Sequence, residues 1–150
     1  MSLRSRLIIN PCRPLTANRL DLLYRLGLWL QPDTTKPVRP LMVGLAQDMD
    51  RIATGLWDED CDLIRQGAHS VAQHPKISPT QVVAIKKALG EQFQNFVRHD
   101  KSVRRAATGL VEAAEPRDWS SILDLHERLK RGCVTRHTEY RDTVRAVLHP

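Results

Sequence analysis

The chain has few of the residues that build β-sheets and tight turns. Only 5% of its 150 residues are aromatic and only seven are glycine, and no stretch alternates between polar and apolar residues as a strand does. Alanine, leucine and arginine are frequent, and these are good helix formers. The composition therefore predicts an all-α protein, and a hydrophobic content of 41% fits one globular domain.

Cysteines and long apolar runs are also scarce. Cys12, Cys61 and Cys133 are an odd number without paired spacing, so no disulfide framework is predicted. Because no run of eighteen apolar residues occurs, we predict no membrane span. The best candidate for an export signal, residues 20–30, is interrupted by charged residues and lacks a small-residue cleavage site, so no clear signal peptide is recognised.

The excess of positive charge lies at one end of the chain. Residues 1–40 carry seven basic and two acidic side chains, whereas residues 41–150 carry sixteen basic and fifteen acidic ones. The main body is thus nearly neutral, with charges mixed in sign as on a solvated helix surface. No helix-turn-helix, zinc-finger or RNA-binding pattern accompanies the basic arm, and we predict no nucleic-acid partner.

Prolines divide the chain into an arm and a body. Residues 1–40 are predicted to form a basic N-terminal arm, with a short amphipathic helix over residues 17–30 and a proline-rich linker over residues 31–40. Residues 41–150 hold four stretches with apolar residues at intervals of three and four. Short connections between them favour an antiparallel up-down-up-down four-helix bundle. We expect the helices at residues 40–57, 58–74, 78–115 and 118–148.

Several residues are predicted to begin or bend these helices. Asp58 is expected to cap the second helix and Asp118 the fourth. Ser78 and Gln81, three residues apart, form a capping-box pattern at the start of the third. Asp100 falls at a position of the third helix where a core residue is expected, so we predict a bend near residues 98–101.

One motif points to chemistry. The run Cys133-Val134-Thr135-Arg136-His137 differs by one residue from the haem-attachment sequence Cys-x-x-Cys-His, in which two thiols form thioethers with haem and the histidine ligates iron. Arg136 stands in place of the second thiol. Cys133 and His137 share one helix face, one turn apart. On periodicity alone we favour a structural role, a buried cysteine and a hydrogen-bonded histidine, because this is the commoner case in helical bundles.

A metal site and an enzyme are weaker interpretations of the same residues. His126, Cys133 and His137 span about 16 Å of helix, so one ion cannot take all three. Only Cys133 with His137 could chelate zinc or copper, and another helix would have to complete the shell. The pair has no visible oxyanion site or orienting acid, and we predict that the protein is not an enzyme.

From about residue 41 to residue 148, the chain resembles the class II c-type cytochromes, the cytochrome c-prime family and its low-spin relatives. The resemblance rests on the order and spacing of four segments: PLMVGLAQDM, VAQHP, GLVEAAEPRDWSSIL and CVTRHTEYR. It implies a four-helix bundle with haem near the C-terminus of the last helix. It also implies a possible homodimer through the first two helices and a periplasmic location.

The resemblance implies roles for individual residues. His137 matches the axial iron ligand and Cys133 the first thioether cysteine. Met42 matches the first-helix residue that faces the other side of the iron, a methionine ligand in low-spin members. Tyr140 and Arg141 match the aromatic and basic residues that commonly follow the histidine.

Arg136 matches nothing in the family pattern, and two hypotheses remain open. In the first, covalent haem is lost and a non-enzymatic bundle without a cofactor serves as a binding or interaction module. In the second, haem held by one thioether or non-covalently, with His137 on the iron, transfers electrons to a redox partner protein or binds a gas. We favour the first, because a changed attachment motif is a direct chemical loss while the rest of the resemblance concerns fold.

The first hypothesis has a structural consequence. Arg136 would point outward, pair with a haem propionate or fill the vacated pocket. Because an empty pocket costs several kcal/mol, a haem-free bundle is expected to fill it with large side chains. The candidates are Trp57, Phe93, Phe96 and Trp119.

Overall fold

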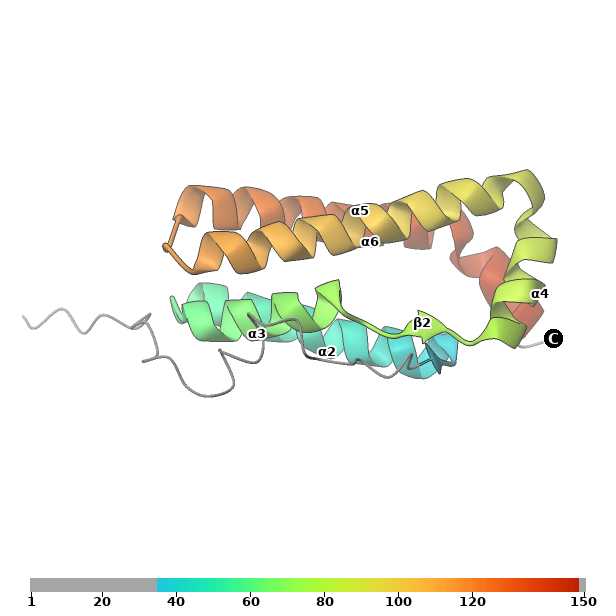
Figure 1. Cartoon of the computed structure of the whole chain (residues 1–150), viewed down its shortest axis with the longest axis horizontal. Coiled ribbons are helices and arrows are strands. Elements are labelled where there is room, and N and C mark those ends of the chain that lie inside the picture. The colour runs from blue at the N-terminus through green and yellow to red at the C-terminus, as the bar shows by residue number, and fades with distance from the viewer. Residues whose placement is uncertain (1–34, 149–150) are drawn as a thin grey trace, which may run out of the picture.

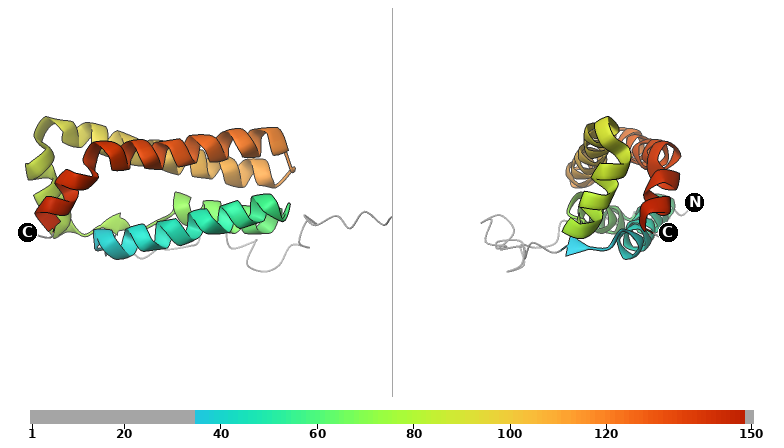
Figure 2. Two further views of the ribbon diagram at one scale, coloured as in Figure 1. Left: turned by 180° about the vertical axis from the view of Figure 1, so that it is seen from behind. Right: turned by 90° about the vertical axis from the view of Figure 1, so that its right-hand side faces the viewer.

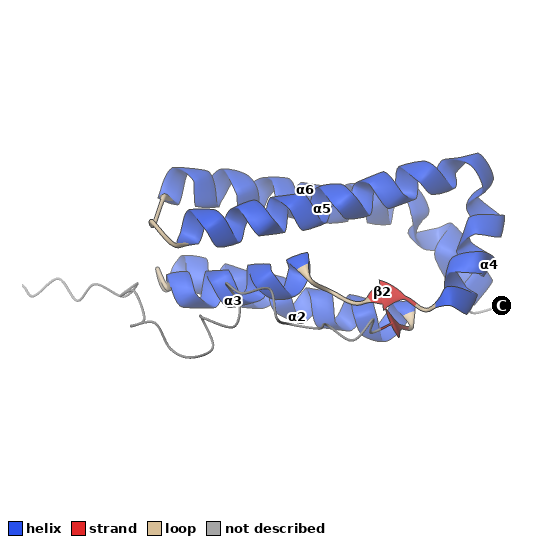
Figure 3. Ribbon diagram, viewed as in Figure 1, coloured by secondary structure: helices blue, strands red, loops and turns tan. Residues whose placement is uncertain are grey.

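The computed structural model describes residues 35–148. Most of them are helical, and the all-α fold class is confirmed (Figure 3). Strand is limited to two residues in each of two segments, which pair in parallel with Thr35 beside Lys76. The elements are β1 (Thr35–Lys36), α2 (Val38–Trp57), α3 (Cys61–Ala72), β2 (Lys76–Ile77), α4 (Pro79–Leu89), the 3-10 turn η1 (Gly90–Gln92), α5 (Phe93–Ala114) and α6 (Trp119–Leu148).

The long helices form two layers, with α2 beside α3 in one and α5 beside α6 in the other (Figure 1). The layers are joined mainly where α3 packs against α5, whereas α2 and α6 hardly touch each other. At one end of the molecule, α4 and the last turns of α6 both bend across from the second layer toward the first (Figure 2). The seam between α2 and α6 is therefore open at this end.

The break in the predicted third helix lies earlier than expected. The helix divides at Gly90, whose φ of +53° suits glycine, and the chain turns there from α4 into α5. Residues 98–101, where a bend is predicted, are helical throughout, since α5 runs through them without interruption.

The helix starts are partly as predicted. Asp118 accepts hydrogen bonds from the backbone and hydroxyl of Ser121 and begins α6, as expected. The prediction for α3 is wrong by two residues: Asp58 ends α2, and Asp60 caps α3 by accepting from the backbone N–H groups of residues 62 and 63.

The capping box predicted for α4 is also wrong. Ser78 makes no side-chain capping bond, although Pro79 occupies the first turn as expected. The Oε1 atom of Gln81 instead accepts a hydrogen bond of 2.8 Å from the backbone N–H of Val38, at the start of α2. Gln81 thus ties α4 to α2. The predicted linker ends earlier than residue 40, since α2 begins at Val38, and the predicted helix over residues 17–30 lies outside the described residues.

Two apolar clusters fill the interior. The main core lies between α2, α3, α5 and α6, and its fully buried members include Ile52, Ile64, Leu110, Ile122 and Leu129. The end cluster lies where α4 meets α5 and α6, and its buried members are Ile85, Leu89, Phe96 and Tyr140.

Close packing of α3 on α2 gives a first test. Gly67→Ala should lower the free energy of unfolding by about 1–3 kcal/mol, because the added methyl group would lie 2.7 Å from the carbonyl oxygen of Asp48 on α2. The matched change Gly44→Ala meets no heavy atom within 4 Å and should raise stability by up to about 1 kcal/mol through helix propensity. Urea unfolding measures both, and equal effects of the two changes would contradict this packing.

Candidate functional site

A cavity of about 590 Å³ lies at the open end of the seam between α2 and α6. Six of its lining residues are apolar and come from α2, β2, α5 and α6: Val38, Met42, Ile77, Phe96, Val144 and Leu148. Tyr140, buried and edge-on to the ring of Phe96, adds an aromatic surface. Its size is within the range of small-molecule sites, roughly 300–1,000 Å³.

Four arginines also line the cavity: Arg39 from α2, and Arg136, Arg141 and Arg145 from α6. Its described lining contains no carboxylate. Three of these arginines are exposed at the rim, whereas the side chain of Arg136 is only 13% exposed. The cavity is therefore apolar inside and strongly basic around its opening.

Arg136 is held by two contacts within the protein. Its Nη1 donates a 2.9 Å hydrogen bond to Oδ1 of Asp100 on α5, and its guanidinium carbon lies 4.1 Å from the centre of the Phe96 ring. The second contact is a cation–π interaction. Arg136 therefore does not point outward. It is turned inward toward α5 and fixed there. Burial lowers the pKa of the guanidinium, but Asp100 opposes the shift.

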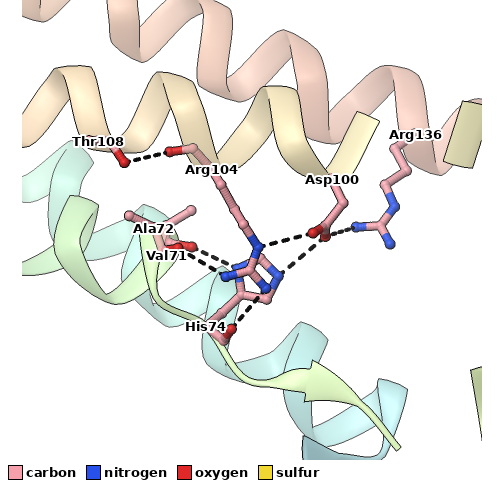
Figure 4. A network of polar contacts seen from close by, with 7 residues as sticks. All are labelled: Val71, Ala72, His74, Asp100, Arg104, Thr108 and Arg136. Atoms are coloured by element: carbon pink, nitrogen blue, oxygen red, sulfur yellow. Dashed lines mark hydrogen bonds and ion pairs between the residues drawn. The ribbon is translucent and has the colours of Figure 1, made fainter. Parts of the chain in front are cut away.

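Asp100 gathers three basic groups, one from its own helix and two from other segments of the chain (Figure 4). Besides Arg136, its carboxylate accepts from Nε of Arg104 at 3.0 Å and lies 3.3 Å from Nε2 of His74. The Nδ1 atom of His74, which is buried, lies 2.7 Å from the carbonyl oxygen of Val71. Both ring nitrogens thus face oxygen atoms, one of a carboxylate and one of a backbone carbonyl.

The same group of residues ends α3. Arg104 donates to the carbonyl oxygens of Ala72 and His74, both at 2.9 Å, where the helix would otherwise leave unpaired acceptors. Burial by itself would raise the pKa of Asp100, yet the pKa lies well below its ordinary value because the surrounding hydrogen bonds and cations outweigh burial. We call Asp100, Arg136, Arg104 and His74 the Asp100 network.

The network explains the polar residue in the core pattern of α5. Asp100 and Arg136 lie 36 residues apart, so no local spacing links them. Sequence reasoning noted each as an anomaly, a carboxylate at a core position and an arginine at a cysteine position, and the structure shows that they are partners.

Cys133 lies apart from the cavity. Its side chain packs against the main core, and it does not line the cavity, although the resemblance expected it to face a haem. Burial raises the pKa of its thiol, which keeps it protonated and a poor nucleophile. His126, the third member of the predicted stripe, is also absent from the lining.

The structure does bring together the other four predicted residues. Met42, Arg136, His137 and Tyr140 all line the one cavity. His137 is exposed at the edge of the cavity. Partial burial of its ring, together with the charges of Arg136 and Arg141, lowers the pKa of its imidazole. A neutral imidazole with a free ring nitrogen is the form that ligates metals.

Several lining residues were missed. Val144, Arg145 and Leu148 continue the face of α6 that carries His137 and Arg141, at helical intervals of three and four. That periodicity was a usable signal. Val38 and Ile77 carried none, because only the tertiary fold places β2 and the start of α2 beside α6.

The large side chains expected to fill the pocket behave differently. Trp57 is 87% exposed at the end of α2, and Trp119 packs against the main core. The prediction that large side chains fill the pocket is therefore wrong for these two residues. Phe93 and Phe96 do belong to the end cluster, and Phe96 forms part of the cavity wall.

No family model, curated protein or solved structure matches this chain. Within residues 35–148, no three metal-ligating side chains come together, and none of the helices there combines the length and apolarity needed to cross a bilayer.

The electrostatics of the network give a second test. Asp100→Asn should lower the free energy of unfolding at pH 7 by about 1–3 kcal/mol, because an amide leaves two guanidiniums without an anion. Folding lowers the pKa of Asp100, so its contribution is fully present above the unfolded pKa of about 4 and is lost as the pH falls below that value. The gap between wild type and variant should therefore narrow below about pH 4.

Urea unfolding between pH 7 and pH 3 measures this gap. Asp142→Asn is the matched control, since Asp142 is 90% exposed and only 3.5 Å from Arg141, and it should change stability by less than about 0.5 kcal/mol. A gap that stays constant down to pH 3 would contradict the role given to Asp100.

Proposed function

We propose that this protein is a non-enzymatic binding protein, built on an antiparallel four-helix bundle of the class II cytochrome type, that has lost covalent haem. The cavity between α2 and α6 is its ligand site. A homodimer and a periplasmic location stay predictions of the same resemblance.

The observation that carries this proposal is the placement of Arg136. At the position where the family has its second thioether cysteine, the side chain is bound to Asp100 and stacked on Phe96. An exposed arginine would need no partner within the protein. Arg136, in contrast, pairs with a carboxylate at a core position of another helix. Its environment supports a site organised around an ion pair.

The position of Cys133 supports the same conclusion. A thioether needs the sulfur at the haem edge, yet Cys133 packs on the main core and does not line the cavity. A half-buried thiol whose pKa is raised is also a slow nucleophile toward a vinyl group.

One observation favours the alternative, a protein that binds haem without a covalent bond. Met42 and His137 come from opposite sides of the seam and line the same cavity. The lowered pKa of His137 keeps its imidazole neutral and able to ligate iron. In this alternative the protein would transfer electrons or bind a gas, and His137 would hold the metal.

Absorption spectra decide between these functions. The protein purified from cells that co-express c-type maturation factors should show no Soret band after acid-acetone extraction, because Cys133 alone does not reach the cavity. Arg136→Cys rebuilds the complete attachment motif and should give a band that survives extraction if the bundle is of the cytochrome type. Cys133→Ser is the control in which no covalent haem can form.

Each departure from this pattern has one meaning. A surviving band in the wild type would overturn the loss of covalent haem. A folded Arg136→Cys protein without covalent haem would contradict the proposed relation to class II cytochromes. Haemin that binds the wild type reversibly, with a spectrum altered by His137→Ala, would establish the alternative.

A further inference from the structure

We infer that the cavity binds an amphipathic carboxylate, with its apolar body between α2 and α6 and its carboxylate on the arginines of the cavity. The inference rests on the proposed function only in taking this cavity as the ligand site. It adds the chemical class of the ligand and the residues that select it.

The walls fit an apolar body. Phe96, Tyr140 and Val144 come from α5 and α6, and Val38 and Met42 come from α2, so an extended chain or flat ring would contact both layers. Burial of such a body gains about 25 cal/mol for each Å² of apolar surface removed from water. This term supplies affinity but does not distinguish a charged ligand from a neutral one.

The charges supply that distinction. Four guanidiniums and no carboxylate line the cavity, so an anionic group is favoured and a cationic one is repelled. Among the described residues, Arg39 and Arg145 have no ion-pair partner, and Arg141 has only the exposed Asp142 at 3.5 Å. These three are free to turn toward a ligand at the opening.

Arg136 is the fixed member of the set. Asp100 occupies one of its terminal nitrogens, and Figure 4 shows the other terminal nitrogen turned away from that carboxylate. No hydrogen bond to Nη2 or Nε of Arg136 is formed by the described residues, and none of their fully buried side-chain polar atoms lacks a partner. The remaining donors are therefore accessible, on a residue that lines the cavity.

A carboxylate suits this group better than a halide or a neutral oxygen. Guanidinium and carboxylate share a planar geometry and form paired, charge-assisted hydrogen bonds. Asp100 and the Phe96 ring already hold Arg136 in place, so little conformational entropy is lost when a ligand pairs with it. The Asp100 network thus presents one preorganised cation at the inner wall.

Titration calorimetry with three probes tests the inference on the full chain. Dodecanoate below its micellar concentration should bind about ten- to a hundredfold more tightly than dodecanol, the gain typical of a charge-assisted hydrogen bond. Dodecyltrimethylammonium should bind more weakly than either. The advantage of dodecanoate over dodecanol should shrink between 50 and 500 mM salt, because the rim arginines are exposed to screening.

Two pairs of variants locate the site. Arg145→Gln should weaken dodecanoate binding severalfold without changing dodecanol binding. Arg128→Gln, on the exposed surface of α6 outside the cavity lining, should change neither. Arg136→Met should remove most of the preference for the carboxylate. If this single change unfolds the protein, the same loss of preference is measured on the double variant Asp100→Asn with Arg136→Met.

The outcomes separate this inference from the proposed function. Equal affinity for dodecanoate and dodecanol would overturn the selection by charge but leave the cavity as a ligand site. Dodecanoate binding that persists in a folded Val144→Trp protein, whose cavity is filled, would place the ligand elsewhere and overturn both. Equal losses of dodecanoate affinity in Arg145→Gln and Arg128→Gln would show that the net charge of the protein, and not the cavity arginines, favours the carboxylate. This result would overturn the inference.

Discussion

The ion pairs of the Asp100 carboxylate hold the two helical layers together near the end of α3. The carboxylate joins three basic groups that come from α5, from α6 and from the segment after α3. Through Arg104 it also reaches the carbonyl oxygens at the end of α3, so the contact between the two helical layers is polar at this point. A charge in this position is costly to bury and stabilises the fold only because every partner is present.

The network borders both apolar clusters, since Arg136 stacks on Phe96 of the end cluster and Arg104 bonds to Ala72, which packs against the main core. Toward the main core the helices pack closely, as the contact of Gly67 with α2 illustrates. Toward the end cluster α2 and α6 make few contacts, and the cavity lies between them. Arg136 belongs to both regions, because one nitrogen pairs with Asp100 while its side chain lines the cavity. Arg136, which stands where the resemblance predicts a cysteine, thus links the Asp100 network to the cavity.

Local patterns predicted the local features of this fold. Intervals of three and four placed the helices, and Asp118 was recognised as a cap because it acts within its own turn. One error falls where a distant partner decides. Gln81 matched a capping box in spacing, but its side chain bonds to Val38, 43 residues away. The break at Gly90 was missed because a lone glycine in a helical pattern does not show whether the chain continues straight or turns.

Residues within a few turns of one another were enough to predict the all-α class and the face of α6 that carries His137 and Tyr140. They did not reveal that Arg136 turns inward to Asp100 or that Cys133 packs on the main core. The difference is one of range along the chain. Helical periodicity fixes which side chains share a face, whereas pairing across helices depends on how two layers meet, and spacing along one chain carries no information about that.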